Sequence, residues 1–465
     1  MSDSINTVIL AAGKGTRLGI NTPKPLCIAL GRTLVDYVIS GISDFSSKCG
    51  KKVSYNLVVG HEKETVEAHI KSKFSHLDPS FATQEQQLGT GHAVKVFFEA
   101  YPKSWKSAYT LVVCADTPLI TEDIYSQLLS EIEDSGVDAV CASFFTQNPT
   151  GYGRIEQKNS GFNIIEEKDA NESQKAIKEV NSGLYLFKTE HIKTFINKID
   201  DNNKSGEFYL TDLFKEGFNV KTLQFCDEKS FLGVNNLIQL EESETILLRR
   251  KLETLMLKGV RMNRADSIYI ETNVEITAGT LIEPNVSIRG NTKIGANSVI
   301  ETGVVIKDST IGDNTTIKAY SYLEGAIIKN HCAVGPMARL REGTEISDNC
   351  KIGNFVETKK SLLHPGAKVS HLSYVGDAEI GENTNIGCGF ITCNYDGAEK
   401  HKTTIGKNTF IGSDCQMIAP ITVGDEAFVG SGSTITKDVP SKAFAIARQR
   451  QVTKEDMAAR FIKKK

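Results

Sequence analysis

The sequence predicts two folded domains of different classes, an α/β Rossmann-like domain followed by a left-handed parallel β-helix. Two observations predict them. Short apolar runs alternate with helical stretches in the first half, and aliphatic residues recur every six positions in the second. A chain of 465 residues exceeds the usual size of one domain, and its 40% of hydrophobic residues can supply two cores. We expect the first domain at 1–235, a linker helix at 236–259 and the second domain at 260–465.

The first domain has apolar runs that are typical of buried strands, and the segments between them have helical spacing. Such alternating units favour a mostly parallel sheet of the kind that handles nucleotides. The predicted strands include Val8–Leu10, Asn56–Val59, Thr110–Ala115 and Gly183–Phe187, and the predicted helices include Leu34–Ile42 and Ile124–Ile132.

The stretch from Asn236 to Lys258 spaces leucines among many charged residues and is followed by Gly259. This pattern predicts one long helix. It is either a linker between the domains or the last helix of the first domain, and the sequence leaves both interpretations open.

The second domain follows from the six-residue period, which neither a helix nor a hairpin produces. Three flat faces of six residues make one triangular coil, the aliphatic residues stack inside it, and glycine or small residues permit the corners. A polar loop from Tyr395 to Thr404 interrupts the period and could reach a neighbouring chain. The repeated residues include Ile276, Ile282, Ile288, Ile294, Ile300, Ile306, Ile311, Ile317, Leu323, Ile328, Val334, Leu340, Ile346, Ile352, Ile380, Ile386, Ile405, Ile411, Met417, Val423, Val429 and Ile435.

Composition argues against several classes of function. A net charge of -3 and the lack of a basic stretch with interleaved aromatic residues argue against nucleic-acid binding. No apolar run approaches the ~20 residues that a bilayer requires, and no secretion signal precedes Thr7. We therefore expect a cytoplasmic protein. Its 10 cysteines are scattered, which favours reduced, buried thiols over a metal site.

A glycine-rich segment, Ala11–Arg17, follows the first predicted strand. Gly13 and Gly15 let backbone N–H groups approach phosphate oxygens, and Arg17 with Lys24 adds the positive charge that a triphosphate needs. The segment fits neither the dinucleotide fingerprint nor the Walker loop. Asp116 ends another predicted strand, where it is either a Mg²⁺ ligand or a turn residue.

These segments resemble the sugar-1-phosphate nucleotidyltransferases, whose signature is L-A-A-G-x-G-T-R followed by P-K. Further segments at 84–93, 151–154, 166–169, 181–183 and 233–236 resemble the uridylyltransferase branch. The resemblance implies transfer from UTP with Mg²⁺, with catalysis by Arg17 and Lys24. It also implies nucleotide contacts by Leu10, Ala11, Ala12, Gly13, Lys24, Gln84, Gly89 and Thr90, sugar-phosphate contacts by Gly153, Glu166, Asn181 and Asn235, and metal ligation by Asp116 and Asn235.

One departure from this resemblance precedes Asp116. The family commonly has Tyr-Gly there, whereas this chain has Cys114-Ala115. The metal role should survive the change, while contacts to the sugar or nucleotide beside it should differ.

Segments of the second domain resemble the acetyltransferase half of the bifunctional N-acetylglucosamine-1-phosphate uridyltransferase / glucosamine-1-phosphate N-acetyltransferase family. They lie at 339–343, 359–360, 370–374 and 393–397 and at Arg448. Acetyl transfer needs an uncharged amine, and a histidine suits the removal of its proton. The resemblance implies His371 as that base, sugar-phosphate contacts by Arg341, Lys359, Tyr374 and Asn385, and acetyl-CoA contacts by Cys388, Asn394, Tyr395, Ser413, Ser431 and Arg448.

The resemblance further implies a homotrimer with acetyltransferase sites between the prisms. One departure is Gly387-Cys-Gly-Phe390 in place of Gly-Ala-Gly-Thr, which we expect to enlarge the side chains close to the thioester. Two alternatives remain: a single-activity nucleotidyltransferase with a structural β-helix, and a non-catalytic regulator that binds a nucleotide sugar.

Overall fold

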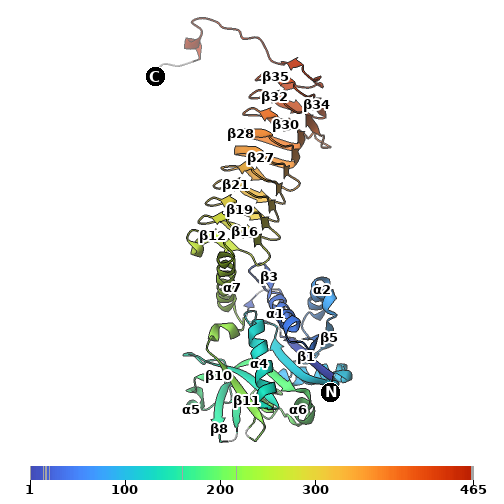
Figure 1. Cartoon of the computed structure of the whole chain (residues 1–465), viewed down its shortest axis with the longest axis vertical. Helices are drawn as coiled ribbons and strands as arrows, with labels where there is room; N and C mark the ends of the chain where they lie inside the picture. The colour runs from blue at the N-terminus through green and yellow to red at the C-terminus, as the bar shows by residue number, and fades with distance from the viewer. Residues whose placement is uncertain are drawn as a thin grey trace. The chain divides into compact units, whose positions relative to one another are not determined.

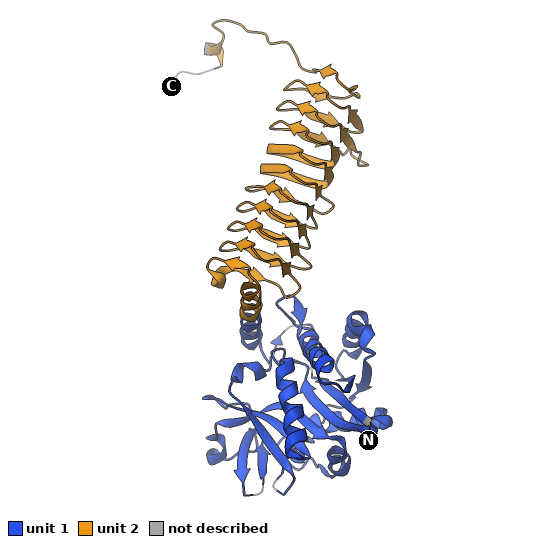
Figure 2. Ribbon diagram, in the orientation of Figure 1, with its two compact units in different colours: residues 1–247 blue, residues 248–465 orange. Residues whose placement is uncertain are grey.

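The chain folds into two compact units, Met1–Leu247 and Leu248–Lys465, which are coloured separately in Figure 2. The structure is a computed structural model, and it describes residues 2–13, 15, 18–19, 21–159, 161–215 and 217–461. None of the described helices is both long and apolar enough to cross a membrane.

A β-sheet forms the centre of the N-terminal unit (Figure 1). It has nine strands, with the main order β11-β7-β10-β6-β1-β4-β5. β1 pairs in parallel with β4 and β6, β4 with β5, and β11 with β7. The predicted strand at Gly183–Phe187 lies in β10, which runs antiparallel to both of its neighbours. The strands are β1 (Ser2–Ala11), β4 (Lys52–Val59), β5 (Ser80–Thr83), β6 (Ser107–Cys114), β7 (Ala139–Phe145), β8 (Arg154–Lys158), β9 (Gly161–Ile165), β10 (Glu179–Lys188) and β11 (Val220–Phe225), besides the separate hairpin of β2 (Ile28–Ala29) and β3 (Arg32–Thr33).

Helices cover both faces of this sheet. The buried side chains of α1, α2 and α4 pack in one core cluster, and those of α3 and α6 pack in another. The parallel strands β1, β4 and β6 therefore end at one shared edge, where α/β sheets bind ligands. The helices are α1 (Leu34–Lys48), α2 (Lys63–Phe74), α3 (Thr90–Ala100), α4 (Glu122–Ser135), α5 (Glu172–Lys175) and α6 (Thr189–Phe195).

The predicted long helix is α7 (Leu237–Leu257), and the boundary between the two units lies inside it. Leu252 and Leu255 are buried in the core of the C-terminal unit. Lys251 Nζ donates to the carbonyls of Thr272 and Val274 at 2.8 and 2.6 Å. The last turns of α7 thus cover the first coil of that unit, and Gly259, with φ of 92°, follows the helix end.

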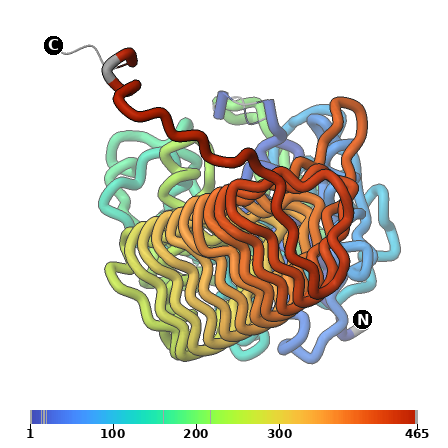
Figure 3. Tube along the Cα trace, turned by 90° about the horizontal axis from the view of Figure 1, so that it is seen from above, coloured from blue at the N-terminus to red at the C-terminus, as the bar shows by residue number. Residues whose placement is uncertain are grey.

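The C-terminal unit is the predicted left-handed parallel β-helix, whose stacked triangular coils are seen in Figure 3. The repeated aliphatic residues point inward: Ile282, Ile300 and Leu323, for example, are completely buried. The polar segment after Cys393 leaves the coil as a loop, and the regular strands resume at Thr403.

Three faces make up this prism, and β27 (Lys351–Leu363) and β28 (Lys368–Ile380) each run through all three. The first face contains β12 (Arg261–Met262), β15 (Leu281–Ile282), β18 (Val299–Ile300), β21 (Thr316–Ile317), β24 (Ala333–Val334), β29 (Asn385–Ile386), β32 (Phe410–Ile411), β35 (Phe428–Val429) and β37 (Phe444–Ala445). The second contains β13 (Tyr269–Ile270), β16 (Ser287–Arg289), β19 (Val305–Lys307), β22 (Tyr322–Glu324), β25 (Arg339–Leu340), β30 (Ile391–Cys393), β33 (Gln416–Ile418) and β36 (Thr434–Ile435). The third contains β14 (Glu275–Ile276), β17 (Lys293–Ile294), β20 (Thr310–Ile311), β23 (Ile327–Ile328), β26 (Glu345–Ile346), β31 (Thr403–Ile405) and β34 (Ile421–Val423).

An apolar ridge follows the corner between the first and second faces. Tyr320, Met337, Phe355 and Leu372 occupy this corner in consecutive coils, and each has a positive φ. Such a backbone conformation usually selects glycine, asparagine or aspartate. All four side chains are nevertheless large and exposed.

The cysteines are all free thiols, as predicted. Five of them are buried and Cys49, Cys114 and Cys393 are partly exposed. The prediction that they are buried is wrong for Cys226 and Cys388, which are exposed. Cys388 lies directly before a coil corner, where side chains point away from the core.

Candidate active sites

A cavity of about 270 Å³ in the N-terminal unit is lined by most of the predicted nucleotide contacts. Ala11 does not line it, because its side chain is buried in the sheet core. The lining residues are the predicted Leu10, Ala12, Gly13, Gln84, Gly89 and Thr90 together with Gln87, Ala93 and Glu207, which the sequence did not single out.

The loop before α3 shapes this cavity. Gln84 Nε2 donates to the Gly89 carbonyl at 3.1 Å, and Gln87 Nε2 donates to the Ala12 carbonyl. Gly89 has φ of 105°, and a Cβ there would lie 2.6 Å from the Phe208 carbonyl oxygen. Only glycine fits this position, so the backbone beside Thr90 can pack closely.

Lys24, Asp116 and Asn235 lie together although they are far apart in the sequence, and a Cβ at Gly15 would lie 2.9 Å from Lys24 Cβ. Lys24 Nζ forms an ion pair with the Asp116 carboxylate and donates to Asn235 Oδ1 at 2.9 Å. The Val234 N–H donates to the Asp116 carbonyl at 2.9 Å, which ties the two loops together. A carboxylate oxygen and an amide oxygen, both facing a cation, are the ligand types that Mg²⁺ prefers. Arg17 lies outside the described residues.

A second cluster joins Gly153, Glu166 and Asn181. A Cβ at Gly153 would lie 3.5 Å from Asn181 Cβ and 3.6 Å from Glu166 Oε1. Burial raises the pKa of the Glu166 carboxyl, and the Thr211 hydroxyl opposes the shift by donating to it at 3.0 Å. Asn181 Nδ2 donates to the Tyr185 hydroxyl at 2.6 Å. This half-buried polar corner can bind a ligand with several hydroxyl groups.

Cys114 lies between these two clusters. Burial raises the pKa of its thiol to about 12, and the Asp116 carboxylate adds to the shift. A Cβ at Gly183 would lie 3.9 Å from its sulfur. Cys114 therefore presents a neutral thiol beside the segment from which the sugar contacts were predicted.

In the C-terminal unit, the predicted base and most of the predicted coenzyme contacts form one corner column. His371, Cys388, Ser413 and Ser431 each directly precede the corner residue of consecutive coils. The coils are joined by the bonds Gly389 N to Leu372 O, Asp414 N to Cys388 O and Gly432 N to Ser413 O, at 2.9, 2.7 and 2.8 Å. Arg448 Nη1 donates to the Ser431 carbonyl at 3.1 Å and ends the column.

Cations gather on the second face, at its edge toward the third face. Arg341 and Lys359 occupy equivalent positions of adjacent coils and line a cavity of about 480 Å³ with Arg339 and Lys360. Arg341 Nη1 donates to Glu357 Oε1 at 2.9 Å. The nearby Lys400 ammonium lowers the pKa of Lys359, and Arg341 adds to this repulsion. A bound phosphate would relieve the repulsion.

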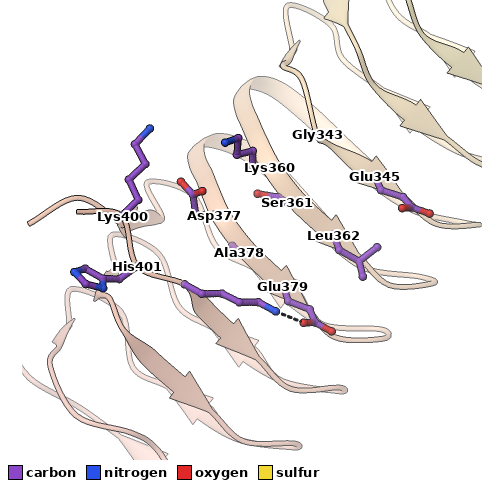
Figure 4. A pocket seen from close by; sticks show the side chains of 11 residues that line it. Gly343, Glu345, Lys360, Ser361, Leu362, Asp377, Ala378, Glu379, Lys400 and His401 are labelled. Atoms are coloured by element: carbon purple, nitrogen blue, oxygen red, sulfur yellow. Dashed lines mark hydrogen bonds and ion pairs between the residues drawn. The ribbon is translucent and has the colours of Figure 1, made fainter. Parts of the chain in front are cut away.

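The loop after Cys393 borders another cavity, of about 430 Å³. Figure 4 shows Lys400 and His401 on the loop, with Asp377 and Glu379 on the coils beside it. Lys402 Nζ pairs with Glu379 Oε2 at 2.6 Å, and Asn394 Nδ2 donates to Asp377 Oδ2 at 2.5 Å. These bonds hold both ends of the loop against the prism, while Tyr395 is exposed.

Comparison with known proteins places both halves of the chain. Residues 6–231 match the family model described as Nucleotidyl transferase, residues 265–347 match the GMPPB C-terminal domain, and residues 402–437 match Bacterial transferase hexapeptide (six repeats).

Full-length relatives are each named "Bifunctional protein GlmU". The protein of Geotalea uraniireducens (strain Rf4) is 42% identical over 460 residues, which cover 97% of this chain and 98% of the relative. Those of Pelobacter propionicus and Thermosipho africanus are 40% and 41% identical over 468 and 456 residues, covering 99% and 98% of this chain and 100% and 97% of the relatives. The chain belongs to the GlmU family. The predicted bifunctional transferase is thereby confirmed.

In this GlmU family member, some predicted partners do not share a surface. Tyr374 pairs with Ile391 on the second face, whereas Asn385 pairs with Phe410 on the first. Arg341 and Lys359 lie with Tyr374 on the second face. A single GlmU prism thus presents the predicted sugar-phosphate contacts on two sides of one corner.

The expected effect of Phe390 on the GlmU surface is wrong. Its side chain is completely buried among the inward residues of the β-helix. Phe390 directly follows the corner residue Gly389, and its side chain points inward. It therefore enlarges the core and not the surface. Cys388, by contrast, does lie on the exposed corner column.

Several GlmU residues were not assigned a role from the sequence. Thr211 and Lys400 contact predicted residues from segments that are distant in the sequence. Gln87 lies within the quoted segment at 84–93, and its polar side chain was the available signal.

Proposed function

We propose that the chain catalyses two consecutive transfers. The C-terminal unit moves an acetyl group from acetyl-CoA to glucosamine 1-phosphate, and the N-terminal unit joins the product to the uridylyl group of UTP and releases pyrophosphate. One observation carries the proposal: the residues predicted to contact each substrate lie together in one unit. The nucleotide contacts surround the cavity of the N-terminal unit, and the coenzyme contacts follow the corner column of the C-terminal unit.

In the uridylyl step, an oxygen of the sugar phosphate attacks the α-phosphorus of UTP in line with the leaving pyrophosphate. The chain contributes position and charge and needs no covalent nucleophile. The cavity by Gln84 and Gly89 holds the nucleoside, and Lys24 faces the phosphates. Arg17 keeps the catalytic role that the family resemblance implies for it. Asp116 and Asn235 would hold Mg²⁺, which supplies further positive charge when it is bound.

The polar cluster of Gly153, Glu166 and Asn181 receives the sugar. The missing side chain at Gly153 leaves room beside two hydrogen-bonding groups. The Thr211 hydroxyl fixes the Glu166 carboxyl, so that its second oxygen can meet a sugar hydroxyl.

In the acetyl step, Arg341 and Lys359 hold the sugar phosphate, and Lys400 adds a third cation. His371 takes a proton from the sugar amine while the amine nitrogen attacks the thioester carbonyl. The new C–N bond forms, the C–S bond breaks, and the sulfur leaves as the thiolate of coenzyme A. The coenzyme lies along the corner column, with Arg448 at its phosphate end.

Assembly into a homotrimer would complete these acetyltransferase sites. The sugar-phosphate set is divided between two faces, so a neighbouring prism must supply the second surface. The apolar ridge runs along the corner that separates these faces and gives the neighbour a hydrophobic contact. Small soluble substrates also favour action in the cytoplasm, without nucleic acid or membrane as partner.

One experiment tests both activities. The purified chain is incubated with glucosamine 1-phosphate, acetyl-CoA, UTP and Mg²⁺, and the products are identified by mass while each reagent is omitted in turn. We expect the acetylated sugar phosphate without UTP and the nucleotide sugar with all four reagents. Absence of the acetylated sugar phosphate would favour the single-activity alternative, and absence of pyrophosphate release would refute the uridylyl step.

A further inference from the structure

His371 has a neutral partner in the neighbouring coil. Its Nδ1 lies 3.1 Å from Asn354 Oδ1, and the two residues pair directly in the register of β27 and β28. Asn354 therefore occupies the corner column one coil before His371. No motif in the sequence singled out Asn354.

The backbone around this pair is tightly fixed. A Cβ at Gly353 would lie 1.7 Å from the Ser370 carbonyl oxygen, so the two coils approach closely just before Asn354 and His371. The Ser373 hydroxyl donates to the His371 carbonyl at 2.7 Å. With both backbones held, the amide can set the direction of the imidazole ring.

The bond also selects the proton position on the ring. An amide oxygen only accepts hydrogen bonds, so Nδ1 must carry the hydrogen. Nε2 then keeps the lone pair that a base requires. The pairing leaves the reactive nitrogen of His371 free for the substrate amine.

Three other histidines have carboxylate partners instead, whereas His92 and His191 contact the Gln84 amide and the Leu213 carbonyl. His69, His364 and His401 lie 2.8, 2.8 and 2.6 Å from Asp36, Glu379 and Asp396. A carboxylate favours the protonated imidazole, which cannot accept a proton. Within the described part of the chain, no carboxylate lies at ion-pair distance from His371, so its partner orients the ring without adding charge.

We infer that Asn354 is a positioning residue for acetyl transfer, which orients His371 and fixes its tautomer. The inference rests on the proposed role of His371 as the base. It assigns a function to the residue that stands directly beneath the base on the prism.

Steady-state acetyl transfer by Asn354→Ala and Asn354→Asp tests this inference in the full-length chain. We expect Asn354→Ala to lower kcat about 10- to 100-fold, the usual cost of losing such an orienting contact, with KM values changed less than threefold. Asn354→Asp should keep its activity at high pH. On acidification it should lose activity earlier, at a higher pH than the wild type does, because the new carboxylate stabilises the imidazolium.

A double-mutant comparison separates positioning from general damage. Asn354→Ala should lower kcat in the wild-type background but not in His371→Ala, because an orienting contact has no effect once the ring is gone. Asn273→Ala is the matched control, since Asn273 also bonds across coils, at 3.5 Å to Asn291, and lies far from the column in sequence. Uridylyl transfer in the same samples reports intact folding of the N-terminal unit.

The outcomes are distinguishable. Wild-type kcat in Asn354→Ala at every pH, or an equal loss with and without His371, overturns the positioning role while leaving the proposed function intact. Full acetyl transfer in His371→Ala overturns the proposed base itself, and the inference with it.

Discussion

Asp116 and Asn235 show how one cation can connect distant segments, because Lys24 Nζ contacts both side chains. We expect Asp116→Asn to lower pyrophosphate release about 100- to 1000-fold, the cost of losing one preorganised charge-stabilising group in an active site. Acetyl transfer should remain within twofold of the wild type. Both rates are measured on one preparation, and equal losses in both would contradict separate sites.

Lys359 provides a second prediction at the same scale. Removing one charge-assisted hydrogen bond costs about 1.5 kcal/mol, which corresponds to roughly a tenfold change in affinity. Lys359→Ala should therefore raise the KM for glucosamine 1-phosphate about tenfold and leave the KM for UTP unchanged. Lys293→Ala, an exposed lysine of the same β-helix, is the control. A normal KM for the sugar phosphate would exclude Lys359 from its site.

The sequence could identify residues that lie within contiguous motifs, such as Gln84, Asp116 and His371. It could not identify Thr211, Lys400 or Asn354, because their contacts exist only after distant segments or successive coils come together. The error at Phe390 has a related cause: the direction of a side chain near a corner depends on the exact corner residue.

At the scale of single elements, the start of α1 contains a buried charge cluster. Asp36 caps the helix with Thr33 and bonds His69 and Lys73 at 2.8 and 2.5 Å. Burial opposes ionisation of Asp36, but the bonds from Lys73 and His69 prevail and its pKa is lowered. A carboxyl whose pKa is lower in the folded than in the unfolded state stabilises the fold at any pH above its unfolded-state pKa. This stabilisation is lost as the pH falls through the folded-state pKa.

Asp36→Asn should therefore destabilise the N-terminal unit by about 1.5 to 3 kcal/mol at pH 7 and by less below pH ~4. Trp105 is the single tryptophan and stacks on Phe98 in this unit, so its fluorescence during urea unfolding reports the N-terminal unit specifically. A stability loss that does not shrink on acidification would contradict the stated role of the carboxylate.

Gly353 tests the coil packing beneath His371. The Cβ of Gly353→Ala would meet backbone, which cannot move as a flexible side chain does, so β27 and β28 must shift apart. We expect more than a tenfold loss of acetyl transfer with normal uridylyl transfer. At Gly430 the nearest atom to a new Cβ is a side-chain atom of Ile446 at 3.3 Å, and Gly430→Ala should be milder.

Elements were predictable where one pattern repeats. The six-residue period predicted the inward residues coil by coil, since each coil obeys the same packing rule. The antiparallel direction of β10 was not predictable, because an apolar run such as Gly183–Phe187 specifies burial and not strand direction.

At the scale of the whole molecule, the apolar ridge predicts association between copies. Leu372→Asp should lower the mass measured by light scattering from three chains to one and abolish acetyl transfer, since charge in a hydrophobic contact is costly. Uridylyl transfer should persist. Ile327→Asp, an exposed apolar position on the third face, should leave the mass unchanged. A wild type that is monomeric at micromolar concentration would contradict the proposed trimer.

The corner column also limits how this protein can change length during evolution. One more coil between His371 and Arg448 would lengthen the proposed coenzyme path by about 4.8 Å, whereas the coenzyme has a fixed reach. The polar loop after Cys393 avoids this, because Tyr374 still pairs with Ile391 and Ala378 with Thr403. Repeats N-terminal to residue 334 can thus be gained or lost without altering the length of the coenzyme path. Insertions C-terminal to His371 must instead loop out of the prism at a corner.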